Sequence, residues 1–528
     1  MGMHLAQAVP PTRRHNCEET VQGHGDRGPQ CMLPEKVSQL QITPDRIVSP
    51  NSLPPELLQL IFERAVDTAD TAPKANAQLI DITHVGRYWR DVALHTPTLW
   101  SHIALTHSDA VKAFLKRSQD LPLRSSVDAT PEALANPKHM FNQVLQALLA
   151  QYGRTSSFKV SVSQSHAFDF AIKRIASARA PQLEKLWIER LPAPDPLVSP
   201  ENRPTDFDGV PRLRSLTFSG EFLPWYPRGP NALTEIDLTN ALHDVHAMVS
   251  LLSRSPSLER VTVGGSFNEH TTRDPRKVTL TRLKRLRMHS YPIRGIAALL
   301  PSLILPSKHT DILLSSPWHY RDDGGFSDII PAYGGAQPLD YAVLQGLRRV
   351  DLWGGYGDQT LCAYRSSDVD DPAEPAVEVK ISRYRSTSER FFVNWPFDAS
   401  SVETITILGH RDVFGVAPRE LWGAMLAAVP ALKTLRVEKI GNSMFDDLIL
   451  RLGSRPLCNQ LETLVLKDVI LDRPAWKALM DVVASRSPAV GGCLSHVAVS
   501  LKGPAVWGQS TSRRMREAGV ELVLTASA

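Results

Sequence analysis

Histidine and cysteine are the residues of this sequence that could ligate a metal, and they gather in two places. The first is an amino-terminal cluster made of His15, Cys17, His24 and Cys31. Its spacings match no common zinc finger and no apolar run surrounds it, so we expect an unstructured tail there. The second is the pair His243 and His246, which would share a helical face at i and i+3. No third ligand is evident, so we expect a solvent-facing helical pair and no metal or other cofactor.

Covalent or phosphate chemistry would require motifs that we do not find. The sequence contains no GxSxG, HExxH or GxxxxGK[ST] pattern. Its glycine doublets, such as Gly264–Gly265 and Gly354–Gly355, lack nucleotide-binding spacing and are typical of turns. A thioester mechanism would need a cysteine beside an activating histidine, and none of the cysteines has one: Cys17, Cys31, Cys362, Cys458 and Cys493. We therefore expect that the chain is not an enzyme.

Composition sets the broad class of the protein. The chain has 528 residues, a formal charge of +4, 22% charged and 42% apolar residues. This is ordinary for a soluble protein and gives no reason to expect nucleic acid or membrane as a partner. The scattered, odd number of cysteines, the lack of a secretory signal and the interruption of the longest apolar stretch by Pro301 predict a cytoplasmic or nuclear protein. The length requires several domains or a repeat array.

Residues 46–105 contain three short helical patterns after a disordered tail, residues 1–45. Ser52, Pro54 and Pro55 stand just before apolar residues one turn apart, which predicts a helix start. A polar loop, Asp67–Ala77, follows it. Val85, Trp89 and Val92 then recur at helical spacing until Pro97. So small a helical core would be stabilised by a partner surface.

These segments resemble an F-box. The matching residues are Leu53, Pro54, Glu56, Leu57, Ile61 and Phe62, then Val85, Arg87, Trp89, Arg90, Val92 and Ala93, then Leu99 and Trp100. Gly86, where the family often has cysteine, and the long loop after the first helix depart from the pattern. The resemblance is to the long-loop form common among fungal F-box proteins. It implies an adaptor-binding surface made of Leu53, Pro54, Leu57, Ile61, Val85, Trp89, Leu99 and Trp100, some of which could instead close the small core.

A repeated phrase organises residues 106–528. Its form is L-x-x-L-x-L, and it recurs from Leu183 to Leu466, mostly at steps of 20–30 residues. The final apolar pair of each copy alternates with polar residues as a half-buried strand does. Helical stretches precede several copies, among them Val245–Ser253, Leu421–Val429 and Trp476–Ser485. Such units cannot bury their apolar faces alone but can do so when stacked.

The array resembles a degenerate leucine-rich repeat. The expected fold class is therefore a small three-helix F-box followed by an irregular α/β solenoid with parallel strands. A doubly wound α/β domain is the alternative, since it also alternates helices with strands. Residues 106–180 would start the solenoid with a strand at Leu121–Val127 and helices at Asn142–Gln151 and Phe168–Ala178.

Two irregular inserts, residues 306–346 and 353–400, are rich in aromatic and arginine residues. Such residues on loops are typical of binding surfaces, although they could also cap the solenoid or pack under their own loops. Ala376–Pro396 is further expected to form an antiparallel hairpin. The candidate target-binding residues are Trp318, Tyr320, Trp353, Tyr356, Arg383, Arg385 and Trp395.

The resemblance implies a substrate receptor of an SCF-type ubiquitin ligase. In that mechanism the F-box binds a Skp-type adaptor, which links to a cullin and a RING subunit, while the solenoid holds an unknown target protein. The chain would raise the local concentration of target near the reactive thioester and catalyse nothing itself. A binding scaffold outside a ligase is one alternative, and an enzyme with its site in the aromatic inserts is another.

Overall fold

The structure is a computed structural model. It describes residues 50–104, 107–129, 141–191, 209–220, 232–267, 276–290, 294–316, 339–354, 359–369, 374–381, 397–409, 421–453, 457–502 and 508–527. The chain divides into two compact units, Met1–Pro54 and Pro55–Ala528, and the fold below is that of the second unit. Within the described ranges, none of the helices is both long enough and apolar enough to cross a bilayer.

The second unit begins with three α-helices and a 3-10 turn. They are α1 (Pro55–Asp67), α2 (Ala72–Val85), α3 (Arg87–Leu94) and η2 (Pro97–Trp100). Proline begins α1 and Glu56 lies in its first turn, where the helix dipole favours a negative charge. The predicted loop Asp67–Ala77 is wrong in length, because Pro73 in the first turn of α2 starts that helix earlier than expected.

The helical run predicted through Val85, Trp89 and Val92 is broken between α2 and α3. Gly86 has an extended backbone, with φ −173° and ψ 167°, so the helical hydrogen bonds stop and start again there. The two helices remain joined because Arg90 Nε donates a hydrogen bond of 2.8 Å to the Thr83 carbonyl. Val85 therefore ends one helix, whereas Trp89 and Val92 belong to the next.

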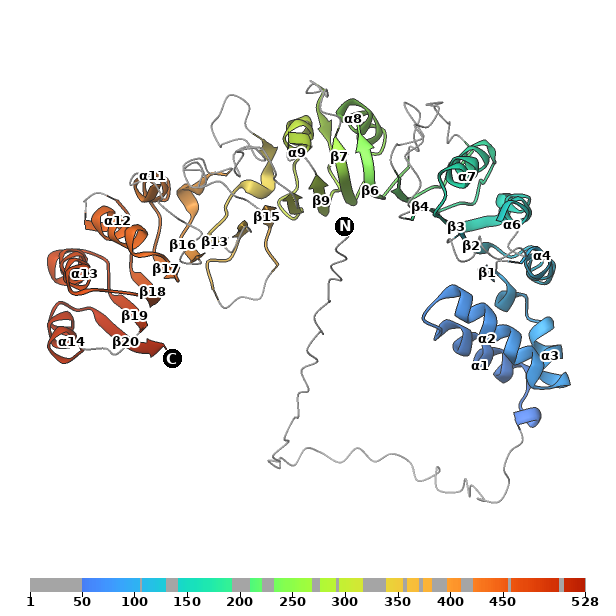
Figure 1. The fold of residues 1–528 in the computed structure, drawn as a ribbon, viewed down its shortest axis with the longest axis horizontal. Coiled ribbons are helices and arrows are strands. Elements are labelled where there is room, and N and C mark those ends of the chain that lie inside the picture. Colours follow the sequence, from blue (N-terminus) through green and yellow to red (C-terminus); the bar gives the residue numbers. More distant parts are fainter. Residues whose placement is uncertain are drawn as a thin grey trace, which may run out of the picture. The chain divides into compact units, whose positions relative to one another are not determined.

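One large sheet of 17 strands occupies the rest of the unit (Figure 1). All neighbouring strands pair in parallel except β14, which is antiparallel to β13 and β15. In spatial order the strands are β1 (His102–Ile103), β2 (Leu123–Ala129), β3 (Thr155–Val162), β4 (Lys185–Arg190), β5 (Ser215–Ser219), β6 (Glu235–His243), β7 (Arg260–Phe267), β9 (Arg285–Ser290), β11 (Asp311–Ser316), β15 (Val377–Ile381), β14 (Gln359–Tyr364), β13 (Arg349–Gly354), β16 (Thr404–Gly409), β17 (Thr434–Glu438), β18 (Thr463–Val469), β19 (His496–Lys502) and β20 (Glu521–Ser527).

The repeated phrase becomes the buried face of this sheet. Each of its copies forms a strand, and equivalent apolar residues are partners in the register. One such row is Leu186, Leu216, Ile236, Val261 and Leu286, and each of these side chains is at most 1% exposed. A second row is Val350, Ile405, Leu435 and Leu464. Of the predicted α/β solenoid with parallel strands, the structure thus shows the coarser feature, one large and mostly parallel sheet.

Helices line the same side of the sheet along its length (Figure 1). This differs from a doubly wound domain, which has helices on both faces. We call the opposite side of the sheet the strand face. The helices are α4 (Ser108–Arg117), α6 (Phe141–Leu149), α7 (Ser165–Ser177), α8 (Val245–Ser253), α9 (Arg294–Leu299), α11 (Leu421–Ala427), α12 (Asn442–Gly453), α13 (Arg473–Arg486) and α14 (Gly508–Glu517).

The two segments predicted as inserts supply strands rather than loops alone. Residues 306–346 contain β11, and residues 353–400 contain β14 and β15. The first strand of the hairpin predicted across Ala376–Pro396 is β15, which pairs with β11 and with β14, and residues 382–396 of that prediction lie outside the described residues. The antiparallel hairpin that does form is β13 with β14. A small second sheet contains β8 (Val278–Thr279), β10 (Leu303–Leu305) and β12 (Asp340–Tyr341).

Two smaller predictions are also corrected. His243 ends β6 and His246 lies in α8, with Asp244 capping the helix between them, so the two histidines share no helical face. Gly264–Gly265 lies inside β7 and is not a turn. No group of three or more potential metal ligands occurs among the described residues, and the cluster His15, Cys17, His24 and Cys31 lies outside them.

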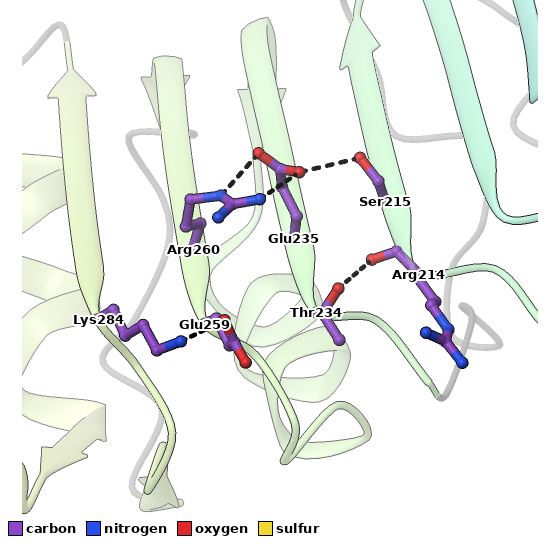
Figure 2. A network of polar contacts seen from close by, with 7 residues as sticks. All are labelled: Arg214, Ser215, Thr234, Glu235, Glu259, Arg260 and Lys284. Atoms are coloured by element: carbon purple, nitrogen blue, oxygen red, sulfur yellow. Dashed lines mark hydrogen bonds and ion pairs between the residues drawn. The ribbon is translucent and has the colours of Figure 1, made fainter. Parts of the chain in front are cut away.

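Polar contacts connect neighbouring strands near their amino-terminal ends. Figure 2 shows Arg260 donating to Glu235, which also accepts from Ser215, and Lys284 donating to Glu259 at 2.8 Å. The hydrogen bond from Arg260 is the main reason that the pKa of Glu235 is lowered. Exposed pairs of this kind contribute little stability each. Their main effect is to favour one register between adjacent strands.

The helical module caps the first edge of the sheet. Asn76 of α2 is 1% exposed, and its carboxamide meets the edge of β1 that β2 leaves open. Its Nδ2 donates to the His102 carbonyl at 2.7 Å, and its Oδ1 accepts from the Ala104 amide at 2.7 Å. Trp100 packs edge-on against Phe114 of α4 with ring centroids 4.7 Å apart. The predicted boundary at residue 105 therefore separates residues that share one core.

Replacing Asn76 with leucine tests this cap. The change leaves a buried carbonyl and a buried amide without partners, and each loss costs about 1–3 kcal/mol. We expect a lower melting temperature and faster hydrogen exchange in β1 and β2. Lys74→Ala is the control. Lys74 lies on the same helix as Asn76, and its replacement removes only an exposed ion pair with Asp70. Equal melting temperatures for the two variants would show that the contact does not cap the sheet.

Candidate adaptor-binding surface

Helix α1 carries apolar residues on two faces. Leu58 and Phe62, one turn apart, are fully buried against the rest of the module. Leu57, Leu60 and Ile61 lie on a second face at i, i+3 and i+4, and they are 48%, 58% and 46% exposed. A helix that only served its own core would have polar residues on that second face. The exposed face therefore suits a partner protein.

Helices α2 and α3 provide the other predicted residues of the surface. Val85, at the end of α2, is 62% exposed. Trp89 is half-buried, with its ring 5.2 Å from that of Phe62. Its Nε1 is buried and has no hydrogen-bond acceptor among the described residues. Trp89 thus contacts the core with one part of its ring and leaves another part accessible.

Leu99 and Trp100 lie in the protein's own core. They are 4% and 0% exposed. The indole Nε1 of Trp100 donates a hydrogen bond of 2.7 Å to the Ala93 carbonyl, and the Arg117 guanidinium lies 4.3 Å from its ring centre. These two residues position α3 against α4 and offer no surface to an adaptor in this conformation.

Leu53 and Pro54 precede α1. Leu53 is half-buried and Pro54 is exposed. They belong to the first compact unit. Within the second unit Leu57 is not sealed beneath later segments, and the predicted residues that remain accessible there are Leu57, Ile61, Val85 and part of Trp89.

Sequence reasoning missed Leu60. The signal was present, since residues 57–62 contain five apolar residues and one glutamine. One helical face cannot bury all five, because successive residues point about 100° apart around the helix. At least one more apolar residue of this segment had to face outward.

Comparison with known proteins identifies the module. Residues 50–106 match the F-box-like family, so the chain carries an F-box-like domain at its described amino-terminal end. No curated protein matches the sequence. Among 14 matching chains of solved structures is one from "Crystal structure of Rad7 and Elc1 complex in yeast". It is 12% identical, covers 89% of this chain and 92% of that chain, and has a TM-score of 0.25.

The predicted target-binding residues fall mostly outside the described residues. This applies to Trp318, Tyr320, Tyr356, Arg383, Arg385 and Trp395. Trp353 is described, lies on β13 and is 48% exposed. The described residues next to the other segments are neighbours in the sheet, since Ser316 pairs with Ile381, Ile381 with Gln359 and Gln359 with Gly354. The carboxyl ends of β11, β15 and β13 thus lie on the same side of the sheet, next to the amino end of β14.

Substitutions at buried and at exposed residues of this domain should differ in their effect on the free energy of unfolding. Trp100→Ala should lower the free energy of unfolding by about 3–5 kcal/mol, because it opens a cavity and removes a buried hydrogen bond. Ile61→Ser should change it by no more than about 0.5 kcal/mol. Thermal unfolding followed by circular dichroism measures both. A large loss for Ile61→Ser would mean that this residue belongs to the core.

Proposed function

We propose that this protein is a substrate receptor of an SCF-type cullin–RING ubiquitin ligase. The F-box-like domain binds a Skp-type adaptor, and the leucine-rich-repeat-like solenoid binds a target protein in the cytoplasm or nucleus. The protein itself catalyses no reaction. The observation that carries this proposal is the exposed apolar face of α1, in the domain that matches the F-box-like family.

The energetics of that face support an adaptor. Fully burying a leucine or isoleucine side chain stabilises a complex by about 1.5–3 kcal/mol. Leu57, Leu60, Ile61 and Val85 are each roughly half exposed, so covering all four supplies several kcal/mol before the costs of association. Central apolar anchors of this kind are typical of interface hot spots.

Two of the cysteines are unsuited to thioester chemistry. Burial raises the pKa of Cys362 to about 12 and that of Cys458 to about 11. Both thiols are therefore protonated near neutral pH, whereas the thiolate is the nucleophile in thioester formation. This supports a receptor that positions a target for a separate catalytic subunit.

The adaptor surface is tested with the full chain and a purified Skp-type adaptor. Leu57→Asp and Ile61→Asp should each weaken binding at least about 30-fold, because a charge would be buried in an apolar interface. Leu450→Asp is the matched control, since Leu450 is 67% exposed on α12 in another part of the protein. Isothermal titration calorimetry gives the affinities, and circular dichroism checks the fold of each variant.

The outcomes are distinct. Wild-type protein that binds no Skp-type adaptor, or Leu57→Asp that binds as tightly as Leu450→Asp, would contradict the proposal. Binding of Elc1 in place of a Skp-type adaptor would keep the adaptor surface but remove the SCF assignment. Adaptor binding without recruitment of a cullin would favour a scaffold that acts outside a ligase.

A further inference from the structure

The strand face of β9 is unusually basic. Arg285, Arg287 and His289 alternate along this strand with the buried residues Leu286 and Met288. All three basic side chains therefore project from the same face of the sheet. Since parallel neighbours are in register, the residues beside them on β7 and β11 form part of the same surface.

Several cations at or next to the start of a strand have a carboxylate partner at the start of a neighbouring strand. Arg260 lies 3.0 Å from Glu235 (Figure 2), Lys433 lies 3.2 Å from Glu403, and Arg285 lies 3.9 Å from Asp311. Arg287 differs, because it is exposed and has no carboxylate within ion-pair distance in the part of the chain that the structure describes. Among the described residues, no carboxylate therefore compensates its positive charge at close range.

The acidic residues around Arg287 leave this charge available. Burial and Glu235 raise the pKa of Asp237, which lies two strands away. Arg287 acts in the opposite direction but has the smaller effect. Glu378 lies two strands away on the other side, and its carboxylate is 2.6 Å from Lys380 Nζ. Neither acid is therefore paired with Arg287.

His289 and Ser315 form a polar pair beside Arg287. They are partners in the β9–β11 register, and His289 Nδ1 lies 2.5 Å from Ser315 Oγ. Burial, Arg287 and Lys380, in that order, lower the pKa of His289. The imidazole is therefore neutral near pH 7. In the tautomer in which the Ser315 hydroxyl donates to Nδ1, the ring proton resides on Nε2, which can then donate to a ligand.

Two residues of β7 lie beside these donors. Gly264 is the register partner of His289, and Thr262 is the partner of Arg287. A Cβ atom at Gly264 would come no closer than 3.5 Å to any neighbour, so packing does not require glycine there. Gly264 is itself buried, and a Cβ there would lie in van der Waals contact with Thr239 of β6, so β7 presents no side chain of its own beside the imidazole.

We propose that Arg287 and His289, with Ser315 orienting the imidazole, bind a carboxylate side chain in an acidic segment of the target protein. This inference rests on the proposed function, because it assigns a chemistry to the target that the receptor holds. A guanidinium binds a carboxylate through two parallel hydrogen bonds, and charge-assisted bonds of this kind are the stronger ones.

The charge balance favours a carboxylate over a phosphate. Arg287 supplies one uncompensated positive charge, Lys380 is paired with Glu378, and His289 is neutral. One carboxylate neutralises this charge, whereas a phosphate of nearly two negative charges would leave an excess of negative charge on the sheet. Binding of a phosphate instead is therefore one of the outcomes that the experiment below distinguishes.

The test uses the full chain with carbon-labelled histidine and NMR of the imidazole Cε1–H, assigned through His289→Gln. The probes are a short peptide of alternating glutamate and glycine and its glutamine counterpart. We expect the glutamate peptide to shift the His289 signal and raise its pKa, because a nearby carboxylate favours the charged imidazole. The glutamine peptide should do neither. Binding should weaken as salt is added.

Two variants and a third peptide complete the experiment. Arg287→Gln should weaken the glutamate peptide about 10-fold, as expected for loss of a charge-assisted contact. Lys477→Gln makes the same charge change at an exposed residue of α13 and should have no effect on peptide binding. An unshifted His289 signal, or equal effects of the two variants, would overturn the proposal. So would tighter binding of a matching phosphoserine peptide, which would assign the site to phosphate.

Adaptor binding is measured separately, so the two hypotheses fail independently. Leu57→Asp should lose the adaptor and bind the glutamate peptide as wild-type protein does. Arg287→Gln should bind the adaptor with unchanged affinity. Peptide binding without any adaptor binding would overturn the ligase function and leave the carboxylate site in place.

Discussion

The parallel register of the main sheet is the constraint on which the rest of the structure depends. A strand in this sheet buries one row of side chains only when its neighbours place apolar residues at the same level. Leu216, Ile236 and Val261 meet this condition as register partners. The same register decides what lies on the opposite face, because side chains alternate. It therefore places His289 beside Ser315 and Arg285 beside Asp311.

A sheet of this kind has open edges, and the first one is closed by a side chain rather than by another strand. The carboxamide of Asn76 offers one donor and one acceptor to β1, as the backbone of a further strand would. An unpaired edge exposes backbone groups that favour aggregation. Repeat arrays generally need such a cap. The F-box-like domain is thus part of the array's own fold, and its orientation is tied to β1.

The sequence allowed the strands to be predicted wherever the phrase L-x-x-L-x-L was intact, because alternation and recurrence are local signals. Leu494, Val497 and Val499 follow the same phrase and form β19, although this copy was missed.

The antiparallel β14 could not be predicted, since its position between β13 and β15 is set by distant pairing. It helps to bury Arg349 and Asp351, at 4% and 8% exposure, whereas the equivalent positions on β17, Thr434 and Arg436, are only partly buried. The helices of the F-box-like domain could be predicted from apolar spacing, but the division between the exposed Leu57 and the buried Trp100 required packing.

The two apolar faces of α1 explain why a small helical module can serve both the array and a partner. Leu58 and Phe62 attach α1 to α2 and α3, and Trp100 attaches this group to α4, so the inward face is fully used. Leu57, Leu60 and Ile61 keep about half of their apolar surface exposed in the isolated chain. Their exposure is unfavourable unless another protein covers them. Because the inward contacts do not involve these residues, an adaptor can bind to α1 without disturbing the cap that holds the sheet.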